Sequence, residues 1–213
     1  MKYLILFLLI SYCSVINAQY NENVFNKIRI EIDGEEIFDV FDITQDHQGY
    51  IWLNSNLGLI KYNGLEGKKY DIKSRDSSST SYDDIDCLFV DYQGILWIGT
   101  SSGLSKYNPE CDCLYHYPTI IKDDTLTMIR SIAEDKNNNI WIGTLNGSLF
   151  RYERERDSFT RILNNHSDSI NVVYNRIYHL LVDQINSLWI GTDSGLVRFN
   201  ISTGSVKQFL HNP

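Results

Sequence analysis

Tryptophan recurs at a nearly fixed interval along this chain. Its four tryptophans lie 45, 44 and 48 residues apart, each inside a similar short phrase; they are Trp52, Trp97, Trp141 and Trp189. A period of this size is typical of a repeat array, in which each unit completes its core only by stacking on its neighbours. The chain is therefore predicted to contain four copies of one small unit.

Each unit reads as four short β-strands joined by turns, without the spacing of an amphipathic helix. The first strand of each unit is expected at 38–44, 85–90, 129–133 and 177–182. The aspartate six residues before each tryptophan is expected to begin a tight turn by bonding to its own backbone. These aspartates are Asp46, Asp91, Asp135 and Asp183.

Residue types that tolerate a positive φ angle mark two hairpins in every unit. Three residues before the tryptophans stand Gly49, Gly94, Asn138 and Asn186. Six residues after the tryptophans stand Gly58, Gly103, Gly147 and Gly195. The tryptophan therefore lies on the second strand, between two turns.

The second strand is apolar on both faces. Aliphatic residues flank every tryptophan, as in Ile51-Trp52-Leu53, so the indole lies on one face and the aliphatic side chains on the other. Strands covered on both sides read this way, whereas a strand of an ordinary sandwich alternates apolar with polar residues. Glycines two residues after the tryptophan, on the indole face, leave room for a neighbour; they are Gly99, Gly143 and Gly191. We therefore predict an all-β fold, a β-propeller of four four-stranded antiparallel blades.

The start of the chain differs from the repeats. Lys2 begins a short basic region, 3–10 is apolar, and Ala18 offers a small residue for cleavage. This pattern is typical of a secretory signal peptide at 1–18 and is too short to span a membrane. We expect export to the periplasm, with no membrane span in the chain. Lipidation at Cys13 is an alternative.

The propeller region is then 19–213, with blades at roughly 24–72, 82–118, 126–163 and 174–210.

Charge argues against one class of partner. The sequence has 19 basic and 27 acidic residues, a net charge of -8, and no basic cluster interleaved with aromatic residues. Nucleic acid is therefore not an expected partner.

Three cysteines follow the signal peptide, and their odd number excludes a complete intramolecular disulfide framework. Cys87 falls on a first strand and is expected to be a small buried apolar residue. Cys111 and Cys113 fall near a fourth strand, about 14 Å away, which is too far to bridge to Cys87. We expect the Cys-x-Cys pair to be ordinary loop thiols, with metal binding or redox cycling as the alternatives.

The phrase Asp-x-x-Gly-x-(Leu/Ile)-Trp-Ile-Gly-Thr-x-x-Gly-Leu-x-x-(Tyr/Phe)-Asn resembles the two-component regulator propeller repeat. The second repeat carries it through Asp91, Gly94, Trp97, Gly99, Thr100, Gly103, Leu104 and Tyr107. The fourth carries it through Asp183, Trp189, Gly191, Thr192, Gly195, Leu196 and Phe199. The third has Ser148 inserted after Gly147, and the first has Asn54 and Ser55 in place of Gly-Thr.

The resemblance implies a function as well as a fold. Such repeats usually form seven-bladed propellers in the periplasmic half of membrane-spanning sensor kinases, often hybrid ones that sense glycans in gut Bacteroidetes. It implies the extracytoplasmic ligand-sensing region of a two-component sensor histidine kinase. The implied partners are an oligosaccharide or other small ligand, together with the remaining blades and the kinase part of a larger receptor. We expect the chain to be a fragment, because it stops where a link to a fifth blade would start.

Because the chain contains no kinase domain, we expect it to be no enzyme and to hold no cofactor. Two alternatives stay open. One is a secreted interaction scaffold that uses the blade rims. Exposed aromatic residues of the links fit protein contact and ligand contact equally; they are Tyr82, Tyr115, Tyr117 and Tyr174. A streptogramin-lyase-like enzyme would need histidines, but His47, His116, His166, His179 and His211 are scattered along the sequence.

The repeated residues are expected to be scaffold positions, with no catalytic or metal residue among them and the ligand-binding residues unknown. Exposed tryptophans could stack on sugars, but their identical place in each unit indicates a core role. The stretch from Asp135 to Asn139 resembles a calcium loop. It lacks the glycine at the sixth position and the glutamate at the twelfth, so turn formation is favoured.

Overall fold

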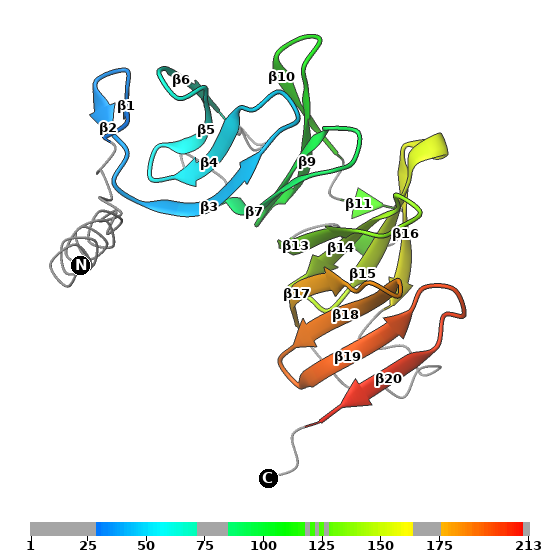
Figure 1. Cartoon of the computed structure of the whole chain (residues 1–213). Coiled ribbons are helices and arrows are strands. Elements are labelled where there is room, and N and C mark those ends of the chain that lie inside the picture. The colour runs from blue at the N-terminus through cyan, green and yellow to red at the C-terminus, as the bar shows by residue number, and fades with distance from the viewer. Residues whose placement is uncertain are drawn as a thin grey trace, which may run out of the picture.

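The computed structural model describes residues 29–71, 85–117, 120–121, 124–125, 128–163 and 176–210. Four four-stranded antiparallel sheets follow one another along these residues, as the colour sequence in Figure 1 shows. The predicted all-β propeller architecture is thereby confirmed, and we call the sheets blades 1 to 4. The predicted signal peptide at 1–18 lies outside the described residues, as do Tyr82, Tyr174, His166 and His211.

Each blade is a meander whose strands pair in chain order. Blade 1 contains β3 (Val40–Gln45), β4 (Ile51–Ser55), β5 (Gly58–Tyr62) and β6 (Gly67–Tyr70). Blade 2 contains β7 (Ile85–Val90), β8 (Leu96–Thr100), β9 (Gly103–Asn108) and β10 (Cys113–His116). Blade 3 contains β13 (Ile129–Glu134), β14 (Ile140–Thr144), β15 (Leu149–Glu153) and β16 (Ser158–Leu163). Blade 4 contains β17 (Ile177–Val182), β18 (Ser187–Thr192), β19 (Gly195–Asn200) and β20 (Val206–Phe209).

Three small elements lie outside this pattern, and the repeat period gives no sign of them. The hairpin of β1 (Glu31–Ile32) and β2 (Glu35–Glu36) places Ile32 against the apolar side of blade 1 formed by Leu53 and Ile60. A second hairpin pairs β11 (Ile120–Ile121) with β12 (Asp124–Thr125) between blades 2 and 3. A single 3₁₀ turn, η2 (Arg154–Arg156), joins β15 to β16.

The blades stand side by side in an arc. The first strand of each blade lies on the inner side of the arc, where β3 contacts β7, β7 contacts β13, and β13 contacts β17 (Figure 1). Blades 1 and 4 stand apart at its two ends. The four first strands, which come from distant parts of the sequence, therefore share one concave face.

The core lies between blades rather than inside any one of them. Trp52 of blade 1 is fully buried in a cluster with Leu88 and Ile98 of blade 2. Trp97 packs in the same way with blade 3, and Trp141 with blade 4. The indole face of each blade thus meets the aliphatic face of the next, which explains why the second strand is apolar on both faces.

Two glycines allow this close approach. A Cβ added at Gly99 would lie 2.6 Å from Cγ2 of Ile129, which belongs to the next blade. One added at Gly143 would lie 2.6 Å from Cγ2 of Ile177. In blade 1 the corresponding residue is Asn54, whose Nδ2 donates a hydrogen bond of 2.8 Å to the carbonyl of Ile85. We call the interface between two neighbouring blades a seam. Because the first repeat has Asn54 where the others have glycine, a hydrogen bond replaces the van der Waals contact at this seam.

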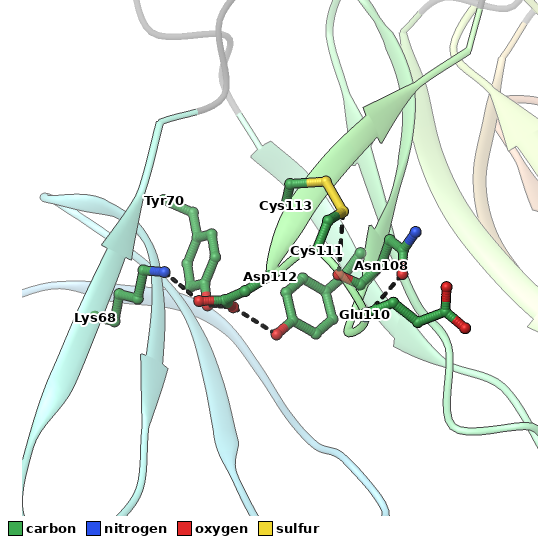
Figure 2. The surroundings of a disulfide bond; sticks show 8 residues. Lys68, Tyr70, Asn108, Glu110, Cys111, Asp112 and Cys113 are labelled. Carbon is green, nitrogen blue, oxygen red and sulfur yellow. Dashed lines mark hydrogen bonds and ion pairs between the residues drawn. A yellow bond between two sulfur atoms is a disulfide. The ribbon is translucent and has the colours of Figure 1, made fainter.

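One expectation about the cysteines is wrong. Cys111 and Cys113 are joined in a disulfide, with their Cα atoms 5.3 Å apart (Figure 2), instead of being loop thiols. The physical reason is a tight turn at Asp112, whose positive φ of 50° brings its two neighbours together. Cys87 is free and half-buried on β7, where burial raises the pKa of its thiol to about 12.

Candidate functional site

The aspartate of each repeat closes a turn and also holds the tryptophan. In blade 2 one oxygen of Asp91 accepts hydrogen bonds from the N–H groups of Gln93 and Ile95 at 3.0 and 2.9 Å. The other oxygen accepts one from the indole Nε1 of Trp97 at 2.9 Å. The matching indole bonds, to Asp46, Asp135 and Asp183, measure 2.9, 2.9 and 2.8 Å. The constant spacing of six residues was the only sequence signal for this bond.

The turn residues have the backbone that their types favour. Asn138 and Asn186 have φ angles of 63° and 62°, in the left-handed region that asparagine tolerates better than most residues. Positive φ angles also occur at Gly49, Gly94, Gly58, Gly103, Gly147 and Gly195. The inserted Ser148 lengthens the second hairpin of blade 3, so that Thr144 Oγ1 donates to the carbonyl of Ser148 at 3.0 Å. These positions form a scaffold.

Three of the tryptophans cannot be platforms for a sugar. Trp52, Trp97 and Trp141 are at most 1% exposed. Trp189 differs, since it lies half-buried on the side of blade 4 that no other described blade covers. The guanidinium of Arg198 lies 5.6 Å from the centroid of the Trp189 ring, and the ring of Phe209 stacks on it at 5.7 Å.

The concave face carries the candidate site. Every first strand has a register shift, and the residue inserted by that shift is Phe41, Asp86, Arg130 or Tyr178. A β-bulge of this kind adds one unpaired residue and re-aims its side chain. All four inserted residues line a cavity of about 590 Å³ along the inner strands. The sequence repeat predicts the strands but does not show where the bulges place side chains.

The cavity combines aromatic and charged groups. Phe41 and Tyr178 are 68% and 43% exposed, so they present aromatic surface to a ligand. Between them, Nη1 of Arg130 lies 2.7 Å from Oδ1 of Asp86, an ion pair that joins blades 2 and 3. Glu134 also lines the cavity, and burial raises the pKa of its carboxyl group. Such a surface suits a polar ligand that also has an apolar face.

The residue that follows each bulge residue makes a hydrogen bond to the next inner strand in blades 1 and 3. Asp42 Oδ2 accepts a hydrogen bond from the N–H of Leu88 in blade 2 at 2.7 Å. Ser131 Oγ accepts the equivalent bond from Leu180 in blade 4 at 3.0 Å. The same register position holds Cys87 in blade 2 and His179 in blade 4. His179 is exposed and lines the cavity.

The described histidines are not brought together. His47 lies in the first turn of blade 1, and His116 shares a 2.7 Å hydrogen bond with Ser105 in blade 2. His179 lies on the inner strand of blade 4. Among the described residues, no group of three His, Cys, Asp or Glu side chains is placed to hold a metal ion.

An arginine that the sequence patterns do not single out links two blades at one end of the sheets. Arg154 Nη2 lies 2.9 Å from Oδ2 of the fully buried Asp91 and 3.3 Å from Oε1 of Glu134. Its Nε donates to the carbonyl of Asn138 at 2.9 Å. A second cavity, of about 350 Å³, lies beside it and is lined by 137–139 and 153–156. Because the guanidinium is already satisfied, this contact is structural.

Sequence comparison bears on the repeats. Residues 80–102 and 125–146 match the profile described as "Two component regulator propeller". The matched segments span the first two strands of blades 2 and 3, where the aspartate, tryptophan and glycine of the seam lie. Two segments of the chain are thus similar to two-component regulator propeller repeats. No curated protein matches the sequence.

Solved structures share the fold of these propeller repeats. Extracellular domains of two putative hybrid two-component systems from B. thetaiotaomicron superpose with TM-scores of 0.68 and 0.65, each at 24% identity. The alignments cover 81% and 87% of this chain but 24% and 23% of those domains. The chain thus spans about a quarter of their length.

A third structure with this fold is an enzyme. Catalytically inactive virginiamycin B lyase from Staphylococcus aureus with quinupristin has a TM-score of 0.64 at 15% identity. That alignment covers 86% of this chain and 59% of the lyase. At these identities the likeness establishes the propeller fold alone. In the described part of the chain, no helix has the length and apolarity to cross a membrane.

Proposed function

We propose that this chain is part of the extracytoplasmic ligand-sensing region of a two-component sensor, and that it is not itself catalytic. The two-component regulator propeller repeats support the sensor role, as do the extracellular domains that share the fold. The observation that carries the proposal is the concave cavity, where four blades each contribute one bulge residue to a common surface. A ligand bound there would contact every blade.

The ligand class we propose is an oligosaccharide. Phe41 and Tyr178 offer the aromatic faces on which the apolar side of a sugar ring packs. Asp86 and Arg130, already fixed by their ion pair, offer a hydrogen-bond acceptor and donors in a defined orientation. The pair needs little reordering on binding, and this preorganisation lowers the cost of association.

The larger receptor is proposed to supply further blades next to blade 4. The indole side of blade 4 exposes Leu181, Leu196 and Phe209, whereas the same side of the other three blades is buried by a neighbour. An apolar patch of this kind marks an interaction surface. A further blade with an aliphatic second strand matches it, because three seams of the same design already exist in this chain.

Signalling requires a ligand that binds one arrangement of the receptor better than another, since a ligand with equal affinity for both arrangements shifts nothing. The inner strands are suited to this role because they form both the cavity and the seams. A ligand that bridges Phe41 of blade 1 and Tyr178 of blade 4 would favour one spacing of the arc.

Titration calorimetry with a panel of oligosaccharides tests the proposal, using both the mature chain and a longer receptor that contains it. For the sugar that binds, Phe41→Ala and Tyr178→Ala should each weaken the affinity about tenfold, because each removes one aromatic face. Tyr92→Ala is the matched control, since the exposure of Tyr92 lies between those of Phe41 and Tyr178 but Tyr92 lies outside the cavity. If neither protein binds any sugar of the panel, the proposed sensing function is wrong.

The enzymatic alternative has weaker support. The lyase shares the fold, but in this chain the described histidines lie on separate blades, and only His179 among them lines the cavity. An enzyme would lose turnover in His179→Ala while retaining ligand binding. A sensor would show no turnover to lose.

A further inference from the structure

One carboxylate fastens the outer edge of blade 1 to blade 2. Asp112 lies in the turn between β9 and β10, and its oxygens accept hydrogen bonds from Tyr107 of its own blade at 2.6 Å and from Lys68 and Tyr70 on β6 (Figure 2). Together, the bonds from Lys68, Tyr107 and Tyr70 hold the pKa of the Asp112 carboxyl well below its usual range. We call these four residues the first clasp.

The next seam repeats the arrangement. Asp157, between η2 and β16, accepts hydrogen bonds from Tyr152 of its own blade at 2.5 Å and from Tyr117 of blade 2 at 2.7 Å. Lys106 of blade 2 lies 3.3 Å from the same carboxylate. Both aspartates have a left-handed backbone, with φ angles of 50° and 44°. At the third seam this backbone position belongs to Gly204, which has no side chain to offer.

The two clasps differ in what holds the aspartate in place. Asp157 follows the 3₁₀ turn η2, and its N–H donates to the carbonyl of Arg154 at 3.4 Å. Asp112 instead stands between Cys111 and Cys113, which are joined in a disulfide (Figure 2). The left-handed region costs energy for residues with a Cβ, although aspartate and asparagine enter it more readily than most, so a turn of this kind gains from a local constraint. At Asp112 the disulfide between its two neighbours is the covalent constraint that favours the conformation the first clasp needs.

The disulfide is also open to reagents. Cys111 and Cys113 are both exposed, as is Asp112 between them. The third cysteine of the described residues, Cys87, is a free thiol and offers no disulfide for a dithiol to attack. Burial also raises its pKa to about 12, so it supplies little thiolate near neutral pH. Exchange with an external dithiol is thus directed to the Cys111–Cys113 pair.

We propose that Cys111 and Cys113 form a thiol–disulfide exchange site whose redox state sets the strength of the first clasp. A thiolate of an external dithiol attacks one sulfur of the pair, forming a mixed disulfide and releasing the other cysteine as a thiolate. The second thiolate of the reductant then breaks the mixed disulfide. Cys111 and Cys113 gain two electrons and, with two protons, become thiols, while the reductant becomes a disulfide.

Reduction removes the constraint on the turn at Asp112. The backbone of Asp112 then leaves the left-handed region in part of the population, and Lys68 and Tyr70 lose their acceptor. Trp52 contacts both tyrosines of the clasp, with ring centroids 5.3 Å from Tyr70 and 4.8 Å from Tyr107. Loosening of the clasp is therefore expected to reach the buried seam between blades 1 and 2.

The test equilibrates the mature protein with reduced and oxidised dithiothreitol at graded ratios. Maleimide labelling followed by mass spectrometry counts the thiols, and amide hydrogen exchange is measured on the same samples. We expect two thiols per chain to appear in one two-electron transition, and exchange in 67–70 and 113–116 to rise about tenfold with it. Exchange in 158–163, beside the second clasp, should not change. The proposal is overturned if the protein stays folded and the Cys111–Cys113 disulfide resists reduction. It is also overturned if amide hydrogen exchange in β6 does not change when the disulfide is reduced.

Variants separate the redox site from the clasp. Asp112→Asn keeps a residue that tolerates the left-handed backbone, so the thiol transition should persist while exchange in 67–70 is high in both redox states. Asp157→Asn is the matched control, because it should raise exchange at the second seam without redox dependence. The double variant Cys111→Ser, Cys113→Ser should show the hydrogen exchange of the reduced protein, and dithiothreitol should not change that exchange. If amide hydrogen exchange in 67–70 still depends on the redox state in Asp112→Asn, the first clasp does not connect the disulfide to β6.

Discussion

The aspartate that precedes each tryptophan has a role that depends on its blade. In all four repeats it accepts bonds from the turn and from the indole. Asp91 also forms an ion pair with Arg154 of the next blade, and its side chain is fully buried. The same repeat position therefore carries a larger share of the stability in blade 2 than in blade 1.

We predict that Asp91→Ala lowers the free energy of unfolding by about 3–5 kcal/mol, because the Asp91 carboxylate is fully buried and accepts hydrogen bonds from two turn N–H groups, the Trp97 indole and Arg154. Asp46→Ala, at the same position of blade 1, should cost about 1–2 kcal/mol, since its turn and indole bonds are partly exposed. Urea denaturation of the two variants gives both values. Equal losses would show that the contact with Arg154 contributes nothing.

The seams between neighbouring sheets lead to a second prediction. Gly99→Ala should lower the free energy of unfolding by about 1–3 kcal/mol, because its Cβ would lie 2.6 Å from both Cys87 Sγ and Ile129 Cγ2. Gly191→Ala should change it by no more than about 0.5 kcal/mol, because the nearest atom lies 3.7 Å away. The two glycines occupy the same place in their repeats, so each variant is the control for the other. A large loss for Gly191→Ala in the four-blade chain would contradict this account of the seam.

Much of each sheet could be predicted from the sequence, because burial on both faces and turn residues leave local patterns. The inner strand predicted at 177–182 has those bounds in the structure. The candidate site could not be predicted, because a bulge changes where Phe41 or Tyr178 points without changing the residue types. The disulfide was missed for a similar reason, since the left-handed backbone of Asp112 that brings Cys111 and Cys113 together does not follow from the residue types.

The assembled arc gives a pH prediction through its buried tyrosines. Burial raises the pKa of Tyr152 to about 12, and burial with the bonds to Asp112 and Asp157 raises the pKa values of Tyr70 and Tyr117 further. In the unfolded chain a tyrosine ionises near pH 10. Because the pKa values are raised in the folded state, the stability contributed by these neutral buried tyrosines is fully present below about pH 10. This contribution is lost as the pH rises above that value.

Urea midpoints measured from pH 7 to pH 11.5 should therefore be constant up to about pH 8.5, fall gently as the Cys87 thiol ionises in the unfolded chain, and fall more steeply above about pH 10, where the tyrosines follow. Tyrosinate absorbance measured in parallel should show a fraction of the tyrosines that ionises only on unfolding. Tyr70→Phe should flatten the fall, because one titrating group is removed from the first clasp. Complete ionisation near pH 10 in a protein that is still folded would contradict the burial of these rings.

The position that follows each bulge residue on the inner strands, held by Asp42, Cys87, Ser131 and His179, has a consequence for assembly. Near-identical repeats in one chain are prone to dock on the wrong partner while they fold. Here the residue at that position is aspartate, cysteine, serine and histidine in blades 1 to 4, and Asp42 and Ser131 each accept a hydrogen bond from a main-chain N–H of the next blade. The scaffold common to the repeats lets any two blades stack, whereas a blade docked on the wrong neighbour would bring a different side chain to the same main-chain N–H. This one position therefore makes the contacts between successive blades chemically unequal.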